Sequence, residues 1–253
     1  MPTILWHIEL SHYNEKVRWA LDYKGIPHER RTPLPGMHRP AALFLTRGAA
    51  GRLPVIELDG RRIGDSTAII AALEAYQPQP ALYPSDPDER ARALALEDDF
   101  DEGLAPHVRR FLWHHTLADR DATVDALMTQ ASDRRRRFMR RVVPLARPAV
   151  KHDYTINAAA AAESVIAIRS FMDRVEDELQ PSGYLVGDAF SVADLSAAAL
   201  FTPVIAPPGR PYAPATVTQP VHELRAELEA RPGGAWVAEM YARHRGVSAE
   251  IAA

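Results

Sequence analysis

The chain has 253 residues, 47% of them hydrophobic and 25% charged, and a formal net charge of -3. This length allows one large or two ordinary domains, and the small net charge excludes a strong bulk attraction to nucleic acid or anionic membrane. Because the chain has no cysteine, disulfides, thiolate metal sites and a protein thiol nucleophile are excluded. Neither a signal-like N-terminus nor an apolar run of membrane-spanning length occurs, so we expect a cytoplasmic protein without a membrane partner.

The N-terminal third predicts the order β-α-β, a bridging segment, then β-β-α. Residues 3–8 are apolar and partly β-branched, which predicts a buried strand. From Tyr13 to Leu21 the apolar residues fall at helical spacing, and Gly25 supplies a stop. The other elements expected here are a strand at 28–32, a short helix near 40–46, a hairpin around Asp59-Gly60 and an amphipathic helix from Ser66.

Prolines recur through QPQPALYPSDP at 77–87, which predicts a stiff, exposed connection. We therefore expect an α/β domain at 1–78, a linker at 79–87 and an all-α domain at 88–253. A second Pro-rich stretch at 203–220 is expected to be a loop across the surface of the helical domain. The expected helices are 87–117, 122–145, 155–180, 192–203 and 220–245, the last broken at Pro232-Gly233-Gly234.

Polar residues follow the first strand in the sequence SHYN, although one N-cap would suffice there. Ser11 or Asn14 can supply that cap. Tyr13 belongs to the apolar spacing of the helix, and His12 has no role that the sequence explains.

Two further positions are suited to a ligand. Pro54 at the start of a strand forces Leu53 to be extended, and without other information we favour a trans bond, because only about 5–6% of X-Pro bonds are cis. Asp65-Ser66 begins a helix directly after a strand. Beyond capping, the free N–H groups and the hydroxyl would suit the carboxylate of an α-amino acid, and Asp65 its ammonium group.

A helix-start device occurs in the second domain. Ser191 is the predicted N-cap, Asp194 completes a capping box, and Phe190 can pack against Leu195. We expect a folding role, so that Asp194→Ala loses about 1–2 kcal/mol of stability with little change in ligand affinity.

Together these stretches resemble the soluble glutathione transferases over residues 1–110 and 184–200. The matching stretches are Ser11 to Leu21 with Lys16-Val17-Arg18, Leu53-Pro54-Val55, Asp65 to Ile69, Asp86 to Ala93 and Gly187 to Leu195. The resemblance implies the glutathione transferase fold, with a thioredoxin-like N-terminal domain, an all-α helical C-terminal domain and usually a homodimer. Residues 118–180 and 203–220 match nothing in the family.

The resemblance also implies a glutathione site. Leu53 would pair through its backbone with the cysteinyl part, Pro54 would be cis, and Asp65 with Ser66 would hold the γ-glutamyl group. The alternatives for the glycyl carboxylate are His38, Arg39 and Arg47.

Ser11 takes the position of the catalytic serine when the chain is aligned on Lys16-Val17-Arg18. A hydroxyl hydrogen bond and the positive end of a helix favour a thiolate, and a thiol pKa lowered by about two units needs about 2.7 kcal/mol. The next residues, His12 and Tyr13, depart from the Pro, Ser or Cys that often follow in the serine classes. Tyr13 therefore stays an alternative donor, and capping an alternative role for Ser11.

The lack of cysteine excludes the family branches that act through a mixed disulfide. Addition, displacement, isomerisation and peroxide reduction by bound glutathione remain. We expect the electrophile to lie against residues 109–115, although an ordinary packed helix fits that stretch equally well. The pocket candidates are Tyr13, Arg110, Trp113 and His114.

No metal site is expected, because His114 and His115 are adjacent on a helix and point apart. The arginines within 134–141 predict a solvated helix face rather than a nucleic-acid site. The leading hypothesis is a glutathione S-transferase acting on a small electrophile. The alternatives are a catalytically silent scaffold with this fold and an enzyme that uses another small thiol.

Overall fold

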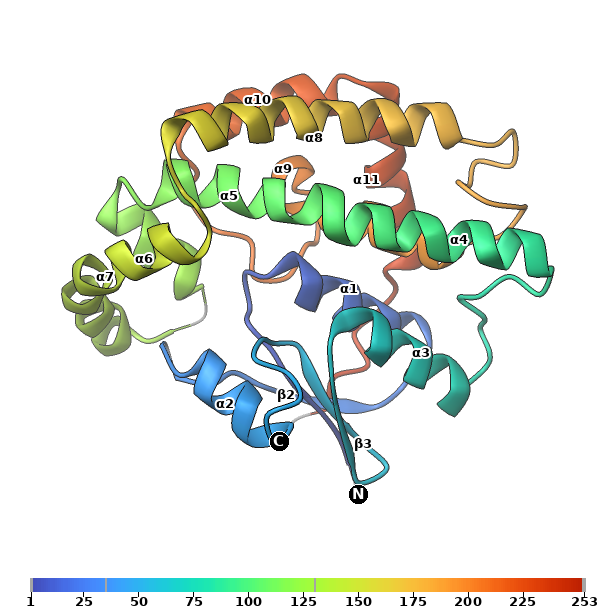
Figure 1. The fold of residues 1–253 in the computed structure, drawn as a ribbon, viewed down its shortest axis with the longest axis horizontal. Helices are drawn as coiled ribbons and strands as arrows, with labels where there is room; N and C mark the ends of the chain where they lie inside the picture. The colour runs from blue at the N-terminus through green and yellow to red at the C-terminus, as the bar shows by residue number, and fades with distance from the viewer. Residues whose placement is uncertain (1, 35, 130, 252–253) are drawn as a thin grey trace.

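The N-terminal part of the computed structural model, which describes residues 2–34, 36–129 and 131–251, is built on a four-stranded sheet (Figure 1). The strand order is β2-β1-β3-β4, with β1 parallel to β2, and β3 antiparallel to both β1 and β4. The strands are β1 (Thr3–Trp6), β2 (His28–Arg31), β3 (Val55–Leu58) and β4 (Arg61–Gly64).

Helices cover both faces of this sheet. Helices α1 (His12–Tyr23) and α3 (Ser66–Tyr76) lie between the sheet and the C-terminal helices, whereas α2 (His38–Leu45) lies apart from them (Figure 1). Alternation along β1 explains the division, because Leu5 belongs to the main core while the neighbouring Trp6 packs in a separate cluster with α2.

The C-terminal part consists of helices and the loops between them, and its described residues form no strand. At its centre α9 (Val192–Ile205) is buried along its whole length and packs against α1. The other helices are α4 (Pro87–Asp99), a π-helical turn η1 (Phe100–Leu104), α5 (Ala105–Thr116), α6 (Arg120–Leu127), α7 (Asp133–Asp153), α8 (Ala158–Glu178), α10 (Gln219–Glu229) and α11 (Pro232–His244). The predicted fold class is confirmed. Between α3 and α4 no helix or strand is formed, and the domain limits stay a prediction.

Several helix boundaries differ from the prediction. The predicted helix 122–145 is two helices, and the second continues through Pro144 and Pro148 to Asp153. The predicted break in the last helix is present but lies at residues 230–231, between α10 and α11, and Pro232 begins α11, where its missing N–H is not needed. A Cβ on Gly234 would lie 2.0 Å from the Leu228 carbonyl oxygen, so glycine allows the close approach between α10 and α11.

The second Pro-rich stretch also differs from its prediction. Helix α9 continues through Pro203, so the loop comprises residues 206–218. This loop does not simply cross the surface, because Arg210 is only 8% exposed and the Tyr212 ring lies 5.0 Å from the Arg18 guanidinium carbon. It therefore packs against the turn at the start of α1.

Buried charges connect α1 to the helical domain. The Lys16 ammonium lies 2.7 Å from a Glu97 carboxylate oxygen and 2.6 Å from Asp101, and Thr67 of α3 donates to the same Asp101 oxygen. Lys16 and Glu97 are fully buried. The lysine of the family-like motif therefore joins the two domains rather than facing a ligand.

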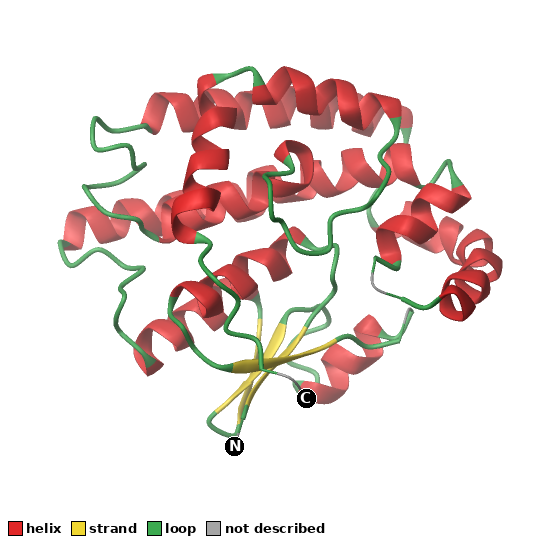
Figure 2. Cartoon of the chain, turned by 180° about the vertical axis from the view of Figure 1, so that it is seen from behind, coloured by secondary structure: helices red, strands yellow, loops and turns green. Residues whose placement is uncertain are grey.

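The end of the chain returns to the N-terminal sheet (Figure 2). The His28 N–H donates to Ala249 O at 3.2 Å, and the Ile251 N–H donates to His28 O at 2.9 Å. Residues 249–251 thereby occupy the outer side of β2.

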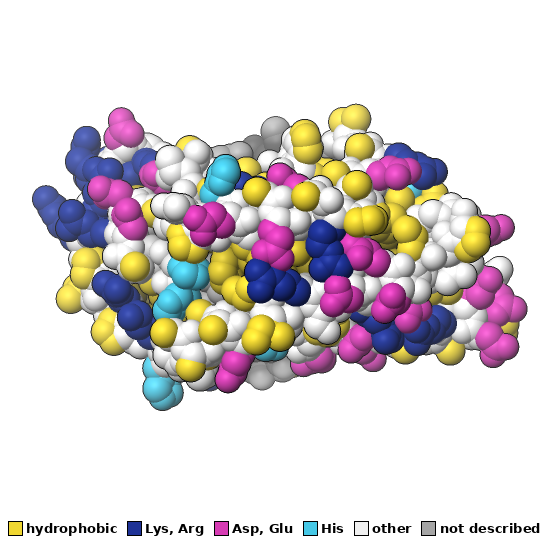
Figure 3. Space-filling model, turned by 90° about the horizontal axis from the view of Figure 1, so that it is seen from above, with side chains coloured by type: hydrophobic (Ala, Val, Ile, Leu, Met, Phe, Trp, Pro, Cys, Tyr) yellow, Lys and Arg dark blue, Asp and Glu magenta, His cyan; other side chains and the backbone are white. Residues whose placement is uncertain are grey.

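Helix α7 carries the predicted arginine face. Arg136 pairs with Asp125, and Arg140 pairs with Asp121 at 2.8 Å, so both bind α6. Lys and Arg side chains gather at the left edge of Figure 3, the side on which Figure 1 places α7.

Within the described ranges, no helix combines the length and apolar character of a membrane span, and no three His, Asp or Glu side chains form a metal-binding group.

Candidate active site

A buried arginine fixes the turn between β1 and α1. The Arg18 guanidinium is fully buried, pairs with Glu15 at 2.8 Å, and donates to the carbonyl oxygens of Ile8 and Glu9 at 3.3 and 3.1 Å. It also lies 2.9 Å from His7 Nδ1, which must accept because arginine has no acceptor. Burial is the main cause, and the positive charge of Arg18 the second, that lowers the pKa of His7 to about 2. The buried Arg18 charge therefore stabilises the turn, and breaking its ion pair would strongly destabilise the fold.

Ser11 is the N-cap of α1. Its hydroxyl oxygen accepts from the Asn14 N–H at 3.4 Å, and the side chain is half-buried. The alternative that Asn14 is the cap is wrong, because Asn14 lies inside the helix and is fully buried. Its side chain accepts from the Ile8 N–H at 3.2 Å and donates to Leu53 O at 3.5 Å. Asn14 therefore joins the turn before α1 to the segment before Pro54.

The two residues after Ser11 are held by the helical domain. The Tyr13 hydroxyl donates to Asp101 O at 2.7 Å, and burial raises its pKa. His12 Nε2 lies 3.1 Å from Ala105 O, so that nitrogen carries the proton and donates. The pKa of His12 is lowered to about 3, mainly by burial and next by the positive charge of Arg109. His12 is therefore a neutral link to the start of α5, a role that needed the tertiary structure to be seen.

The ligand-binding residues that the resemblance implied lie around one cavity. The Leu53-Pro54 bond is cis, as implied. Asp65 caps α3, with one carboxylate oxygen accepting from the N–H groups of Thr67 and Ala68 at 3.1 Å. The buried Ser66 follows it. The residues of this set that line the cavity are Ser11, Leu53, Pro54, Asp65 and Ser66.

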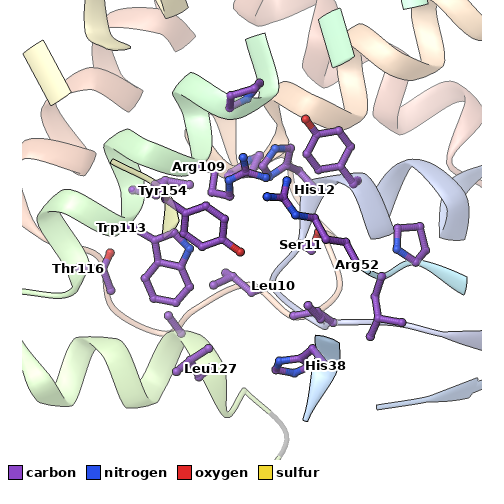
Figure 4. A pocket seen from close by; sticks show the side chains of 18 of the residues that line it. Leu10, Ser11, His12, His38, Arg52, Arg109, Trp113, Thr116, Leu127 and Tyr154 are labelled. Atoms are coloured by element: carbon purple, nitrogen blue, oxygen red, sulfur yellow. The ribbon is translucent and has the colours of Figure 1, made fainter. Parts of the chain in front are cut away.

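The cavity has a volume of about 800 Å³ and lies between the two domains. In Figure 4, Trp113 and Tyr154 face Ser11, Arg52 and His38 across it. Of the candidates for a glycyl carboxylate, His38 and Arg39 line the cavity and Arg47 does not.

Two of the predicted pocket residues, Arg110 and His114, are wrong, because the face of α5 that carries them does not line the cavity. Arg109 and Trp113, four residues apart, share the face that lines the cavity, whereas Arg110 and His114 do not line it. Arg110 instead donates to Tyr154 O at 3.2 Å and approaches Ser164 of α8. The imidazoles of His114 and His115 do not point apart, because their ring centroids are 4.8 Å apart in an edge-to-face contact.

Comparison with known proteins identifies the N-terminal part. A family model described as "Glutathione S-transferase, N-terminal domain" matches residues 5–81. This domain belongs to the glutathione S-transferase family. Maleylacetoacetate isomerase of Rattus norvegicus is 33% identical over 107 residues, which cover 41% of this chain and 49% of the rat protein. The chain thus spans about half the length of this curated relative.

The whole chain has the glutathione S-transferase fold. The β-etherase LigF from Sphingobium sp. strain SYK-6 is 22% identical with a TM-score of 0.61, and the match covers 94% of this chain and 99% of that one. A glutathione S-transferase from Methylobacterium radiotolerans, solved in complex with glutathione sulfonate, is 23% identical with a TM-score of 0.56 and 93% coverage of both chains. At this level of identity the likeness concerns the fold.

Proposed function

We propose that this chain is an enzyme of the glutathione S-transferase family that binds glutathione and activates its thiol beside Ser11 for attack on a small electrophile. The observation that carries the proposal is that Ser11, Leu53 with cis-Pro54, and Asp65-Ser66 all line one cavity between the domains. The cytoplasm as the location and a homodimer as the assembly are parts of the same proposal.

The roles of the side chains follow from their chemistry. The Ser11 O–H can donate to a sulfur at the start of α1, where the N-terminal end of the helix also favours negative charge. Asp65 and Ser66 at the start of α3 offer a carboxylate for an ammonium group and a hydroxyl with backbone N–H groups for a carboxylate. Leu53 offers backbone hydrogen bonds to the middle of the tripeptide.

The reaction is either a transfer to the electrophile or an isomerisation that begins with addition of the thiolate. In displacement, a C–S bond forms as the leaving group departs with its bonding electron pair. The isomerase named among the relatives makes the second route worth assaying, because reversible addition of a thiolate to a conjugated double bond permits rotation before elimination.

The first test is calorimetry of glutathione binding to the wild type and to Asp65→Ala. We expect micromolar to millimolar binding by the wild type and a loss of at least about tenfold in the variant, since a charge-assisted hydrogen bond is worth about 1.5–3 kcal/mol. If the folded wild type does not bind glutathione but binds another small thiol, that thiol is the cosubstrate instead. No binding of any thiol would leave the scaffold alternative.

A matched control is Asp86→Ala. Asp86 caps α4 with the same pattern of hydrogen bonds, accepting from the N–H groups of Asp88 and Glu89, but it does not line the cavity. Both variants lose a helix cap, so only a loss of binding confined to Asp65→Ala supports a ligand contact.

A further inference from the structure

Arginines are concentrated in the cavity without acidic partners. Within the described ranges, none of the cavity arginines has a carboxylate oxygen within 4.0 Å, whereas Arg18, Arg169 and Arg231, outside the cavity, each pair with a carboxylate. The acidic residues that line the cavity are all exposed, namely Asp65, Glu102 and Asp153. The arginines that line it are Arg39, Arg52, Arg109, Arg210 and Arg225.

Arg210, from the loop 206–218, is the most buried of these arginines. It is only 8% exposed, and its Nε and Nη2 atoms have no hydrogen-bond partner among the described residues. The carboxylate that acts on it most strongly is Glu15, which is already bound by Arg18, Arg245 and Tyr241. Arg210 is therefore a surplus buried cation, and burying such a group without partners is costly.

The cation persists at neutral pH. Burial lowers the pKa of Arg210 to about 10, which leaves the guanidinium protonated in the physiological range. A ligand that supplies a negative charge would offset the cost of burying this group.

Arg225 and Arg109 are also guanidinium groups without a carboxylate partner in the described ranges, but they are less buried than Arg210. Each is half-buried and has an Nε that meets no hydrogen-bond partner in the part of the chain that the structure describes. Arg225 donates through Nη2 to Pro203 O at 3.2 Å, and the Arg109 guanidinium lies 4.5 Å from the centre of the Tyr154 ring. Neither contact neutralises the charge.

The positions of these arginines separate them from the proposed glutathione subsite. Arg109, Arg210 and Arg225 come from α5, the loop 206–218 and α10, whereas Ser11, Leu53 and Asp65 belong to the N-terminal domain. His38 and Arg39 of that domain are available for a glutathione carboxylate. The three arginines of the helical domain are left for the second reactant.

We propose that the electrophile carries a carboxylate, and that Arg210 with Arg225 and Arg109 binds it. This inference rests on the proposed function, because it names the class of the second substrate. A carboxylate is planar and accepts two parallel N–H bonds from a guanidinium, so it matches the groups that the cavity presents.

The test compares an acid with its neutral amide. The probes are S-(4-carboxy-2-nitrophenyl)glutathione and S-(4-carbamoyl-2-nitrophenyl)glutathione, the products expected when the glutathione thiolate displaces chloride from 4-chloro-3-nitrobenzoate or its amide. By calorimetry we expect the wild type to bind the acid about 10–100-fold more tightly than the amide. Arg210→Met and Arg225→Met should each reduce that ratio at least about fivefold.

The matched control is Arg137→Met, which removes the same charge from the exposed face of α7, away from the cavity. The acid-to-amide ratio should be unchanged in this variant. Circular dichroism and thermal unfolding check that each variant is folded, and Arg225→Met serves if Arg210→Met does not fold.

The outcomes separate this inference from the proposed function. Equal binding of acid and amide, or an unchanged ratio in both cavity variants, overturns the carboxylate site even when glutathione binds. If glutathione does not bind, 4-chloro-3-nitrobenzoate and its amide are titrated alone. A preference for the acid that Arg210→Met or Arg225→Met removes then supports the site although the proposed function has failed, and no preference overturns the site.

Discussion

The Ser11 hydroxyl oxygen accepts a hydrogen bond from the Asn14 N–H at 3.4 Å, which leaves the hydroxyl proton free of that bond. Capping uses a lone pair, whereas stabilising a thiolate uses the proton. The two roles that compete in a reading of the sequence are therefore compatible in one side chain.

Ser11→Ala tests both roles at once. Loss of the donated hydrogen bond should raise the pKa of the bound glutathione thiol by about one to two units, since such a bond is worth about 1.5–3 kcal/mol. Loss of the cap should reduce the free energy of unfolding by about 1 kcal/mol. Thiolate absorbance against pH and urea denaturation measure the two effects.

The matched control is Ser191→Ala, which weakens the start of α9 outside the cavity. It should lower stability and leave the thiol pKa unchanged. An unchanged thiol pKa in Ser11→Ala would mean that the hydroxyl only caps the helix.

Arg18→Lys should be strongly destabilising. Lysine cannot reproduce the fork with which the fully buried Arg18 side chain reaches Glu15 and the partly buried carbonyl groups of Ile8 and Glu9. We expect a loss of about 3 kcal/mol in the free energy of unfolding. Urea denaturation measures it, with Arg169→Lys as the control.

Arg169 makes an exposed, two-pronged pair with Glu227. Its conversion to lysine should change stability by less than about 0.5 kcal/mol. Similar losses in the two variants would contradict the prediction that the buried Arg18 contributes more to the free energy of unfolding than an exposed arginine.

His12→Gln should change the pH dependence of stability. The folded pKa of His12 is about 3, below its ordinary value of 6.5, so between these pH values the unfolded chain holds a proton that the folded chain lacks. This residue therefore contributes stability above about pH 6.5 that is lost on acidification, by about 1.4 kcal/mol per pH unit. Glutamine keeps an N–H for Ala105 O and does not titrate.

Urea denaturation from about pH 8 to about pH 5 measures this contribution. The wild type should lose stability relative to His12→Gln as the pH falls, and His152→Gln, at an exposed site on α7, should follow the wild type. A difference between wild type and His12→Gln that stays constant with pH would contradict the neutral buried imidazole.

Asp194→Ala should cost more than its role in a capping box alone suggests. The confirmed box includes the Ser191 N–H at 2.9 Å and its hydroxyl at 2.8 Å, and the other carboxylate oxygen accepts from the Leu185 N–H at 2.8 Å. Burial raises the pKa of Asp194 to about 6. Alanine would leave two buried N–H groups unpaired, so we expect a loss of about 3 kcal/mol.

Thermal or urea unfolding measures this loss. Glutathione affinity of the folded Asp194→Ala fraction should stay within about twofold of wild type, because Asp194 does not line the cavity. A large drop in affinity at unchanged stability would contradict a folding role.

Local patterns were sufficient for the elements and for part of the cavity. The apolar run of β1, the Asp59-Gly60 hairpin turn and the caps at Ser11, Asp65 and Ser191 are short-range signals, and each appears in the structure. The helix starts also indicate Ser11 and Asp65-Ser66 as site residues, because the polar groups there exceed what a single cap requires.

Long-range packing decided what the sequence could not. Which face of α5 lines the cavity depends on how α5 meets α8, so the sequence pattern indicates Arg110 whereas Arg109 lines the wall. Arg210 gave no local signal, since proline-rich composition predicts a loop but not what the loop packs against. The role of His12 depends on Ala105, 93 residues away, so no local pattern indicates it.

The pairing of residues 249–251 with His28 bears on how the protein can be dissected. A fragment that ends near residue 78 would leave the outer edge of β2 uncovered, with its backbone groups available to strands of other molecules. It would also lose the partners of Lys16. The first domain of this chain is therefore completed by the last residues of the second, and studies of the isolated α/β part would report on an incomplete, association-prone sheet.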